Sequence, residues 1–311
     1  MTIQTNTPRR GAQDAAIYVT AEIARFLERG VMPWRAPWDS ALAHAMTPGL
    51  PLRATGEAYK GANVLLLWTA QIAHGYSKRT WLTYRNAEAL GAHVRKGEKA
   101  TPVIYYGSAT PRARAQAQPD DEAKPYRFLK LFYVFNAEQC ENLPDGFAAE
   151  ITPAPVDPPA IVRWLERAGA RISFGGASAH YSPSTDTIHL PPTASFRSEE
   201  NAAATAAHEG IHWTGAEHRL DTLKGYFTDK VLKAKEELRA ETGAAIVGAM
   251  TGLAPGHLED HAAYVSTWLS ILKSDPRAFL SAAAKAQAAV DWLVERAGHP
   301  ASATVTQTAA A

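Results

Sequence analysis

Two histidines four residues apart, His208 and His212, with a glutamate directly after the first, form the pattern H-E-x-x-H. On an α-helix, residues i and i+4 lie on one face, so both imidazoles can bind one zinc ion. Glu209 lies about 100° further round the helix, where its carboxylate can act as general base towards a water molecule without binding the metal. Ser198 as N-cap and the alanine-rich stretch 202–207 favour the helix. The pattern therefore predicts a zinc site with Glu209 as its catalytic residue.

A catalytic zinc normally takes three protein ligands and a water molecule, so a third ligand is required. His218 would complete the longer pattern H-E-x-x-H-x-x-G-x-x-H, in which Gly215 ends the helix. Glu237, on a strongly helical downstream segment, is the alternative, and Glu241 one turn further on would hydrogen-bond a ligating imidazole. The longer pattern also needs a methionine in a tight turn, whereas Met250 falls at the end of a predicted helix. This favours Glu237, and both alternatives stay open at this point.

Composition places the chain among soluble globular proteins of the cytoplasm. Its 311 residues can bury a large core, and no run of eighteen apolar residues predicts a membrane span. Residues 1–5 lack the charged and then apolar pattern of a signal peptide. The single cysteine, Cys140, excludes an intrachain disulfide and suits a reducing compartment. We therefore expect no membrane association.

Charge is distributed unevenly along the chain. Residues 1–115 carry 15 Lys and Arg against 7 Asp and Glu, a net charge of +8. Residues 116–311 carry 17 against 24, a net charge of −7. A basic first third joined to an acidic remainder predicts two modules with different partners.

Aromatic residues alternate with basic residues in the N-terminal module. Single-stranded nucleic acid needs this combination, because bases stack on rings while cations follow the phosphates. No helix-turn-helix or zinc-finger pattern indicates a reader of double-stranded DNA. The alternative is that the rings belong to the core of a small mixed domain. The candidates for DNA contacts are Trp34, Arg35, Trp38, Tyr59, Lys60, Trp81, Tyr84, Arg85, Arg95, Lys96 and Lys99.

Hydrophobic periodicity and turn residues predict an α+β protein. Gly210 inside the H-E-x-x-H helix costs about 1 kcal/mol relative to alanine, so it either allows a strand or a substrate to approach closely or has no role. The predicted helices are 14–29, 63–73, one from Trp81 to Gly91, 161–168, the helix with His208, 236–252, 261–273 and 276–297. The predicted strands are 102–107, 126–136, 170–174, 179–181 and 187–190.

Longer motifs carry a resemblance to the ArdC-type antirestriction proteins, whose N-terminal domain is shared with plasmid primases. The resemblance covers about residues 14–297. In the N-terminal module the motifs are Tyr59–Leu67, Trp81–Tyr84 and Gly91–Lys99. In the C-terminal module they are His212–Gly215, Arg219–Asp221, Glu236–Leu238 with Glu241, and Ala283–Gln287. In that family pattern the position of His218 is not a required histidine, which again favours Glu237.

The resemblance implies a small mixed domain that binds single-stranded DNA over residues 12–142, a Pro-rich linker over 143–160 and a zincin-like metallopeptidase domain with C-terminal helices over 161–298. Residues 299–311 are expected to be a disordered tail. The implied function is protection of incoming plasmid DNA from host restriction during conjugation, with one Zn²⁺ or another divalent ion as cofactor. A host restriction enzyme or another protein would be the substrate. The alternatives are a DNA-coating protein with a purely structural metal and a peptidase that cleaves a repressor or a restriction subunit.

Overall fold

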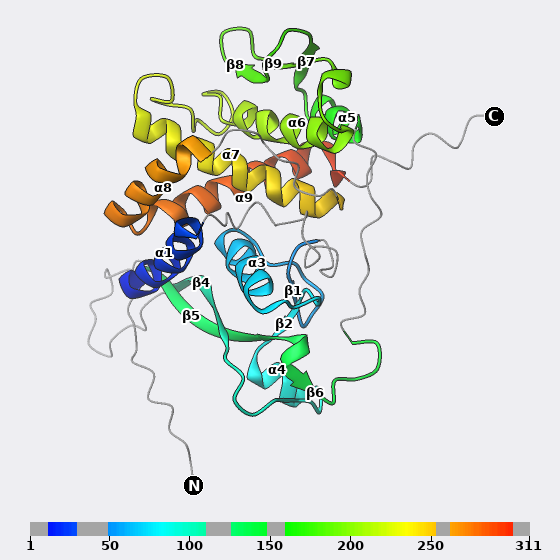
Figure 1. Cartoon of the computed structure of the whole chain (residues 1–311), viewed down its shortest axis with the longest axis vertical. Helices are drawn as coiled ribbons and strands as arrows, with labels where there is room; N and C mark the ends of the chain where they lie inside the picture. Colours follow the sequence, from blue (N-terminus) through cyan, green and yellow to red (C-terminus); the bar gives the residue numbers. More distant parts are fainter. Residues whose placement is uncertain (1–11, 30–48, 110–125, 148–158, 253–261, 301–311) are drawn as a thin grey trace, which may run out of the picture.

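The computed structural model describes residues 12–29, 49–109, 126–147, 159–252 and 262–300 (Figure 1). Most of the predicted linker, the tail beyond residue 300 and the candidates Trp34, Arg35 and Trp38 lie outside these residues. The N-terminal elements are α1 (Ala12–Glu28), β1 (Leu52–Arg53), α3 (Ala62–His74), β2 (Thr80–Leu82), α4 (Tyr84–Ala89), β3 (His93–Val94), β4 (Thr101–Ala109), β5 (Tyr126–Asn136), η1 (Ala137–Gln139) and β6 (Cys140–Glu141). The C-terminal elements are α5 (Pro159–Arg167), β7 (Arg171–Phe174), β8 (His180–Ser182), β9 (Thr187–Leu190), η2 (Thr193–Ser195), α6 (Glu199–Thr214), α7 (Lys230–Thr251), α8 (Ala262–Ser274) and α9 (Ala278–Ala297). The predicted α+β class is confirmed, and none of the helices in the described ranges is long and apolar enough to cross a membrane.

The N-terminal module is built on a four-stranded sheet in the order β1-β2-β5-β4. β4 and β5 form a long antiparallel ribbon, paired from Thr101 with Val134 to Ala109 with Tyr126. The predicted helix from Trp81 is wrong, because Trp81 lies in β2 and is 1% exposed in the core under α3. The helix begins only after Thr83, whose hydroxyl accepts a hydrogen bond from the Asn86 amide at 3.1 Å.

The two modules share one hydrophobic cluster. Ile23 of α1 and Leu65 of α3 belong to the same buried group as Leu238 of α7, Trp268 of α8 and Phe279 of α9. These side chains are between 0% and 2% exposed. Figure 1 shows α1 lying against the C-terminal helices and beside β5, and it contacts both. The N-terminal helix is therefore held by the C-terminal helices as much as by its own sheet.

The C-terminal module packs α6 between a small sheet and the other helices (Figure 1). The sheet has the order β7-β9-β8, with β7 parallel and β8 antiparallel to β9, so β8 is an edge strand. α6 contacts α5, α7 and α9 as well as the sheet. Every residue of its second half, 206–214, is buried, as expected for a helix surrounded on all sides.

Helix α5 packs closely against Gly210 of α6. A Cβ atom at this position would lie 2.5 Å from Cδ2 and 3.0 Å from Cδ1 of Leu165. The sequence analysis considered that a strand or a substrate approaches Gly210, but the structure shows neither at this position. The glycine makes room for the neighbouring helix instead.

A charged cluster joins the β8–β9 turn to the chain that leaves α6. Arg219 donates hydrogen bonds to both carboxylate oxygens of Asp186, at 3.2 Å and 2.5 Å, and to the backbone carbonyl of Trp213 at 2.6 Å. The Tyr181 hydroxyl donates to Asp186 at 2.8 Å. These hydrogen bonds, that of Arg219 foremost, hold the pKa of Asp186 down at about 2. The cluster fixes the sheet edge relative to the end of α6.

We expect Gly210→Ala to lower the free energy of unfolding by about 1–3 kcal/mol, because overpacking against Leu165 outweighs the gain in helix propensity. Urea unfolding of the metal-free protein measures the change. In a double-mutant cycle, Leu165→Ala should cost less in the Gly210→Ala background than in the unmodified chain, because it relieves the clash. A Gly210→Ala variant more stable than the unmodified protein would contradict this packing role.

Asp186 should contribute stability that depends on pH. Its pKa falls from 3.8 to about 2 in the folded chain, so its contribution is present above pH 3.8 and is lost as pH falls towards 2. Asp186→Asn keeps a residue that tolerates the positive φ of 49° while removing the charge. Thermal unfolding should show this variant less stable than the unmodified chain at neutral pH, with the difference shrinking towards pH 2. A difference independent of pH would refute the ion pair as its cause.

Candidate metal centre

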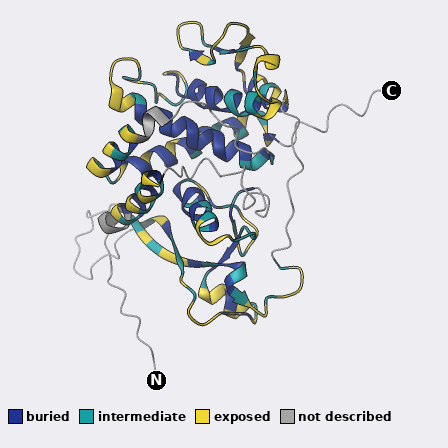
Figure 2. Cartoon of the chain, viewed as in Figure 1, coloured by how far each residue is buried: buried dark blue, intermediate teal, exposed yellow. Residues whose placement is uncertain are grey.

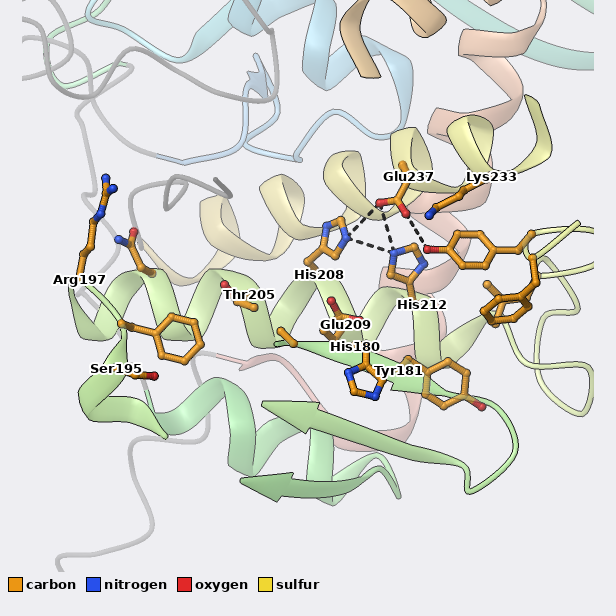
Figure 3. Close-up of a pocket in the computed structure, with 16 residues that line it drawn as sticks. His180, Tyr181, Ser195, Arg197, Thr205, His208, Glu209, His212, Lys233 and Glu237 are labelled. Carbon is orange, nitrogen blue, oxygen red and sulfur yellow. Dashed lines mark hydrogen bonds and ion pairs between the residues drawn. The ribbon is translucent and has the colours of Figure 1, made fainter. Parts of the chain in front are cut away.

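Helix α6 places the two histidines of the H-E-x-x-H pattern side by side. The helix begins at the predicted N-cap, Ser198, whose side chain accepts the Asn201 amide at 3.2 Å. One turn of helix separates His208 from His212, and their Nε2 atoms lie 3.1 Å apart. Both side chains are buried, and both Nε2 atoms face α7 (Figure 3).

Glu237 of α7 completes the group. Its Oε2 lies 3.5 Å from Nε2 of His208 and 3.6 Å from Nε2 of His212. Ligand atoms about 2.0–2.1 Å from a tetrahedral zinc would lie about 3.3 Å from each other. The three separations of 3.1, 3.5 and 3.6 Å bracket that value, so the donor atoms fit one small divalent ion.

His218 is not part of this group. Its side chain is 63% exposed, and its Nε2 lies 3.6 Å from Asp186. The reason is the loop after α6, which Arg219 fixes to Trp213 and to the β8–β9 turn. The preference for Glu237 over His218 thus agrees with the geometry, and Met250 lies within α7 near its end.

A buried chain of charges behind the histidines was missed by the sequence analysis. Nδ1 of His212 lies 3.1 Å from Oε1 of Glu236, and a carboxylate can only accept, so Nδ1 carries a proton and Nε2 is the atom left to bind a metal ion. Arg239 in turn donates to Oε2 of Glu236 at 2.8 Å. The sequence feature that could have indicated this chain of charges is Glu236, a second acidic residue directly before Glu237. The predicted hydrogen bond from an imidazole N–H to the Glu241 carboxylate stays a prediction, and the Glu241 side chain is 3% exposed one turn further along α7.

Helices α6 and α7 bury more negative than positive charge. Four of their carboxylates are at most 8% exposed, against one arginine, Arg239. Burial lowers the pKa of His212, but Glu236 and Glu237 outweigh it and hold this pKa well above its usual value. Burial raises the pKa of Glu237, but His208 and His212 hold it well below its usual range. The field that favours a positive charge between these groups also favours a metal cation.

The group opens into a pocket of about 660 Å³. Glu209 lines it, 8% exposed, and Figure 3 places its side chain between the histidine pair and edge strand β8. Tyr226, which no sequence motif indicated, also lines the pocket and donates a hydrogen bond from its hydroxyl to Oε1 of Glu237 at 2.7 Å. The arrangement thus joins three ligand side chains, a carboxylate base and a hydroxyl at one cavity.

Two of the predicted DNA contacts are core residues instead. Tyr59 is 7% and Trp81 1% exposed, and both belong to the cluster between α3 and the sheet. Neither ring offers a face to a base, so the alternative, a core role, holds for them. Lys60 is exposed, but its Nζ pairs with Asp291 of α9 at 3.0 Å.

The remaining predicted contacts within the described ranges lie on the surface. Tyr84 is 52% exposed on α4. Arg95 pairs with Glu98 at 2.6 Å and donates to the Glu138 carbonyl at 2.6 Å, so part of its charge is already used. The other exposed basic residues of this group are Arg85, Lys96 and Lys99.

Two protein families match consecutive parts of the chain. The N-terminal domain of anti-restriction factor ArdC matches residues 13–135, and a zincin-like metallopeptidase family matches residues 159–285. The uncharacterized protein y4eC of Sinorhizobium fredii (strain NBRC 101917 / NGR234) is 38% identical over 283 residues, which is 88% of this chain and 90% of that protein. A DNA primase TraC of Escherichia coli is 36% identical over 292 residues, 89% of this chain but 26% of the primase. The chain thus corresponds to about a quarter of that primase.

Two crystal structures of the antirestriction protein ArdC from plasmid R388 have the same architecture. The metal-free structure superposes with a TM-score of 0.78 at 39% identity, covering 91% of this chain and 98% of ArdC. The Mn(II)-bound structure superposes with a TM-score of 0.74 at 38% identity, covering 91% and 97%. The similarity extends over both modules, which follow each other in the same order in this chain and in ArdC. The chain therefore belongs to the ArdC family of antirestriction proteins.

Proposed function

We propose that this protein protects incoming plasmid DNA from restriction in the cytoplasm, using a zinc-dependent peptidase site that its N-terminal module brings to single-stranded DNA. One observation carries the hydrolytic part. Structural zinc sites are closed by four protein ligands, whereas catalytic sites keep one position open. Here three side chains converge at the wall of a 660 Å³ pocket that Glu209 also lines.

The ligands of the ion are His208, His212 and Glu237. A divalent ion held there would polarise a peptide carbonyl and lower the pKa of a water molecule. Two histidines and a carboxylate favour zinc over manganese in the order of divalent affinities. The Mn(II)-bound structure of ArdC from plasmid R388 supports the binding of a divalent ion by a protein of this fold.

The other residues of the pocket act on protons and positions. Glu209 does not bind the ion, so its carboxylate is free to take the proton of the attacking water and pass it to the leaving amine. Glu236 holds His212 in the tautomer that presents Nε2. Tyr226 donates to Glu237 and so fixes one carboxylate oxygen, leaving the other to face the histidines.

Strand β8 supplies a surface for an extended substrate. Among the described strands it lies at an edge of its sheet, so its outer backbone groups pair with none of them, and it borders the pocket through His180 and Tyr181. An extended peptide can pair with such an edge by main-chain hydrogen bonds. A locally unfolded or extended segment of a restriction enzyme or another protein is the substrate class that this edge favours.

The metal content of purified variants tests the ligand set. Glu237→Ala removes one of three ligands, so the affinity for Zn²⁺ should fall by more than the 10–100-fold loss typical of an outer hydrogen-bond partner. His218→Ala is the matched control and should keep one ion per chain, because its imidazole is on the surface. Elemental mass spectrometry after dialysis against Zn²⁺ measures both. Metal lost from His218→Ala but kept by Glu237→Ala would reverse the assignment.

Glu209→Gln separates hydrolysis from a purely structural metal. The amide keeps the shape but accepts no proton, so cleavage of a denatured-protein mixture should fall by about 10²–10⁴-fold while bound Zn²⁺ stays unchanged. Cleavage products are followed by mass spectrometry, and protection is followed by transfer of unmodified plasmid into a restricting strain. If the variant binds metal and protects as well as the unmodified protein, the peptidase proposal fails and DNA coating with a structural metal replaces it.

A further inference from the structure

One side of the β4–β5 ribbon carries aromatic rings that neither the core nor the metal centre uses. Tyr105 is 52% and Phe132 46% exposed, and their ring centroids lie 5.8 Å apart in an edge-to-face arrangement. The ring of Phe128 lies on the same face, on the other flank of Tyr105 from Phe132, with its centroid 6.2 Å from that of Tyr105. With Lys130, which stands directly opposite Tyr105, these residues form what we call the ribbon face. Figure 2 shows exposed positions recurring along the ribbon.

The opposite side of the ribbon has a different role. Side chains alternate along a strand, so Leu129 and Leu131 point away from the ribbon face. They pack against the cluster that contains α1 and the C-terminal helices. Val103 and Val134, on the same side as Tyr105, also belong to a buried cluster. The ribbon is thus anchored by Leu129 and Leu131 on one side and by these two valines on the other, and the exposed part of the ribbon face is Tyr105, Lys130 and Phe132.

The backbone makes room for these rings. Gly107 pairs with Phe128 across the ribbon. A Cβ atom there would lie 2.8 Å from Cε1 of Tyr105 and closer still to Cζ of Phe128. Glycine therefore lets both rings lie over the backbone with their outer faces in solvent.

Charge on the ribbon selects the kind of partner. Neither strand contains an aspartate or glutamate, while β5 contains Arg127 and Lys130. Nζ of Lys130 lies 4.8 Å from the ring centroid of Phe128, so cation and ring share one surface. The N-terminal module, residues 12–142, carries 16 Lys and Arg against 12 Asp and Glu, a net charge of +4. Exposed rings beside a cation on a basic module match unpaired bases and their phosphates, whereas a duplex keeps its base faces stacked inside.

We propose that the ribbon face is the platform on which single-stranded DNA lies, with bases stacked on Tyr105 and Phe132 and a phosphate beside Lys130. This inference rests on the DNA binding proposed above and gives it a location. Tyr59 and Trp81 were predicted to contact DNA but are buried in the core, and we assign base stacking to the ribbon face instead.

Fluorescence anisotropy of the full-length protein with a fluorescein-labelled oligodeoxythymidylate tests the location. Stacking is worth about 1–3 kcal/mol per base, so Tyr105→Ala and Phe132→Ala should each weaken binding about 5–150-fold. Tyr105→Phe should bind like the unmodified protein. Tyr106→Ala is the matched control, because Tyr106 is the next residue of the same strand, 60% exposed, on the other side. Lys130→Ala should reduce the slope of log affinity against log salt by about 0.7.

The outcomes separate the location from the function. If the unmodified protein binds and both ribbon variants bind equally well, the ribbon face is wrong and the DNA-binding proposal stands. If the unmodified protein does not bind, both fail. Variants that keep DNA affinity but lose protection would assign the surface to a protein partner and overturn the proposal.

Photo-crosslinking provides a readout that needs no substitution. The unmodified protein is irradiated with an oligonucleotide that contains 5-iododeoxyuridine, and the adducts are mapped by mass spectrometry. Adducts at Tyr105, Phe128 or Phe132 are expected. Adducts confined to other segments would overturn the assignment.

Discussion

The buried guanidinium of Arg239 is the contact on which the metal centre depends. It is 1% exposed and donates to the Ile211 carbonyl at 2.7 Å and to the Thr214 hydroxyl at 3.1 Å, both in the last turn of α6. Carbonyls of a last turn lack helical partners and carry partial negative charge, so a cation is stabilised there. The same guanidinium neutralises Glu236, which holds His212. One side chain therefore fixes the end of one helix, the spacing to the next and the orientation of a ligand.

Helix α7 transmits this arrangement to the rest of the molecule. Leu238, directly after Glu237, belongs to the cluster shared with α1, α3, α8 and α9. Ala240 and Ala244 belong to the cluster around α5, α6 and the small sheet. Because α7 is buried along most of its length, a shift of Glu237 would have to move one of the two cores. The N-terminal module and the metal centre are thus joined through packing, in addition to the chain between them.

The buried carboxylates of the metal centre carry an electrostatic cost for the stability of the folded chain. Several buried carboxylates around one arginine destabilise a chain unless a cation compensates them. Such groups would add nothing to a structural core, which apolar side chains fill more favourably. Their retention in a pocket wall is consistent with a site built to hold a divalent ion. The exposed rings of the ribbon face carry a solvation cost in the other module, and a ligand bound over them would remove it.

The sequence by itself determined the local features. The spacing of His208 and His212, the N-cap at Ser198 and the β4–β5 strands follow from periods and capping rules that act within a few residues, and most helices lie where they were predicted. Only the tertiary structure decided which acid faces the histidines, because Glu236, Glu237 and Glu241 share one helix and the packing of α7 on α6 selects among them. It also decided which aromatics are buried. Trp81 and Tyr105 look alike in sequence, but the cover of α3 over one end of a twisted sheet makes the first a core residue and leaves the second in solvent.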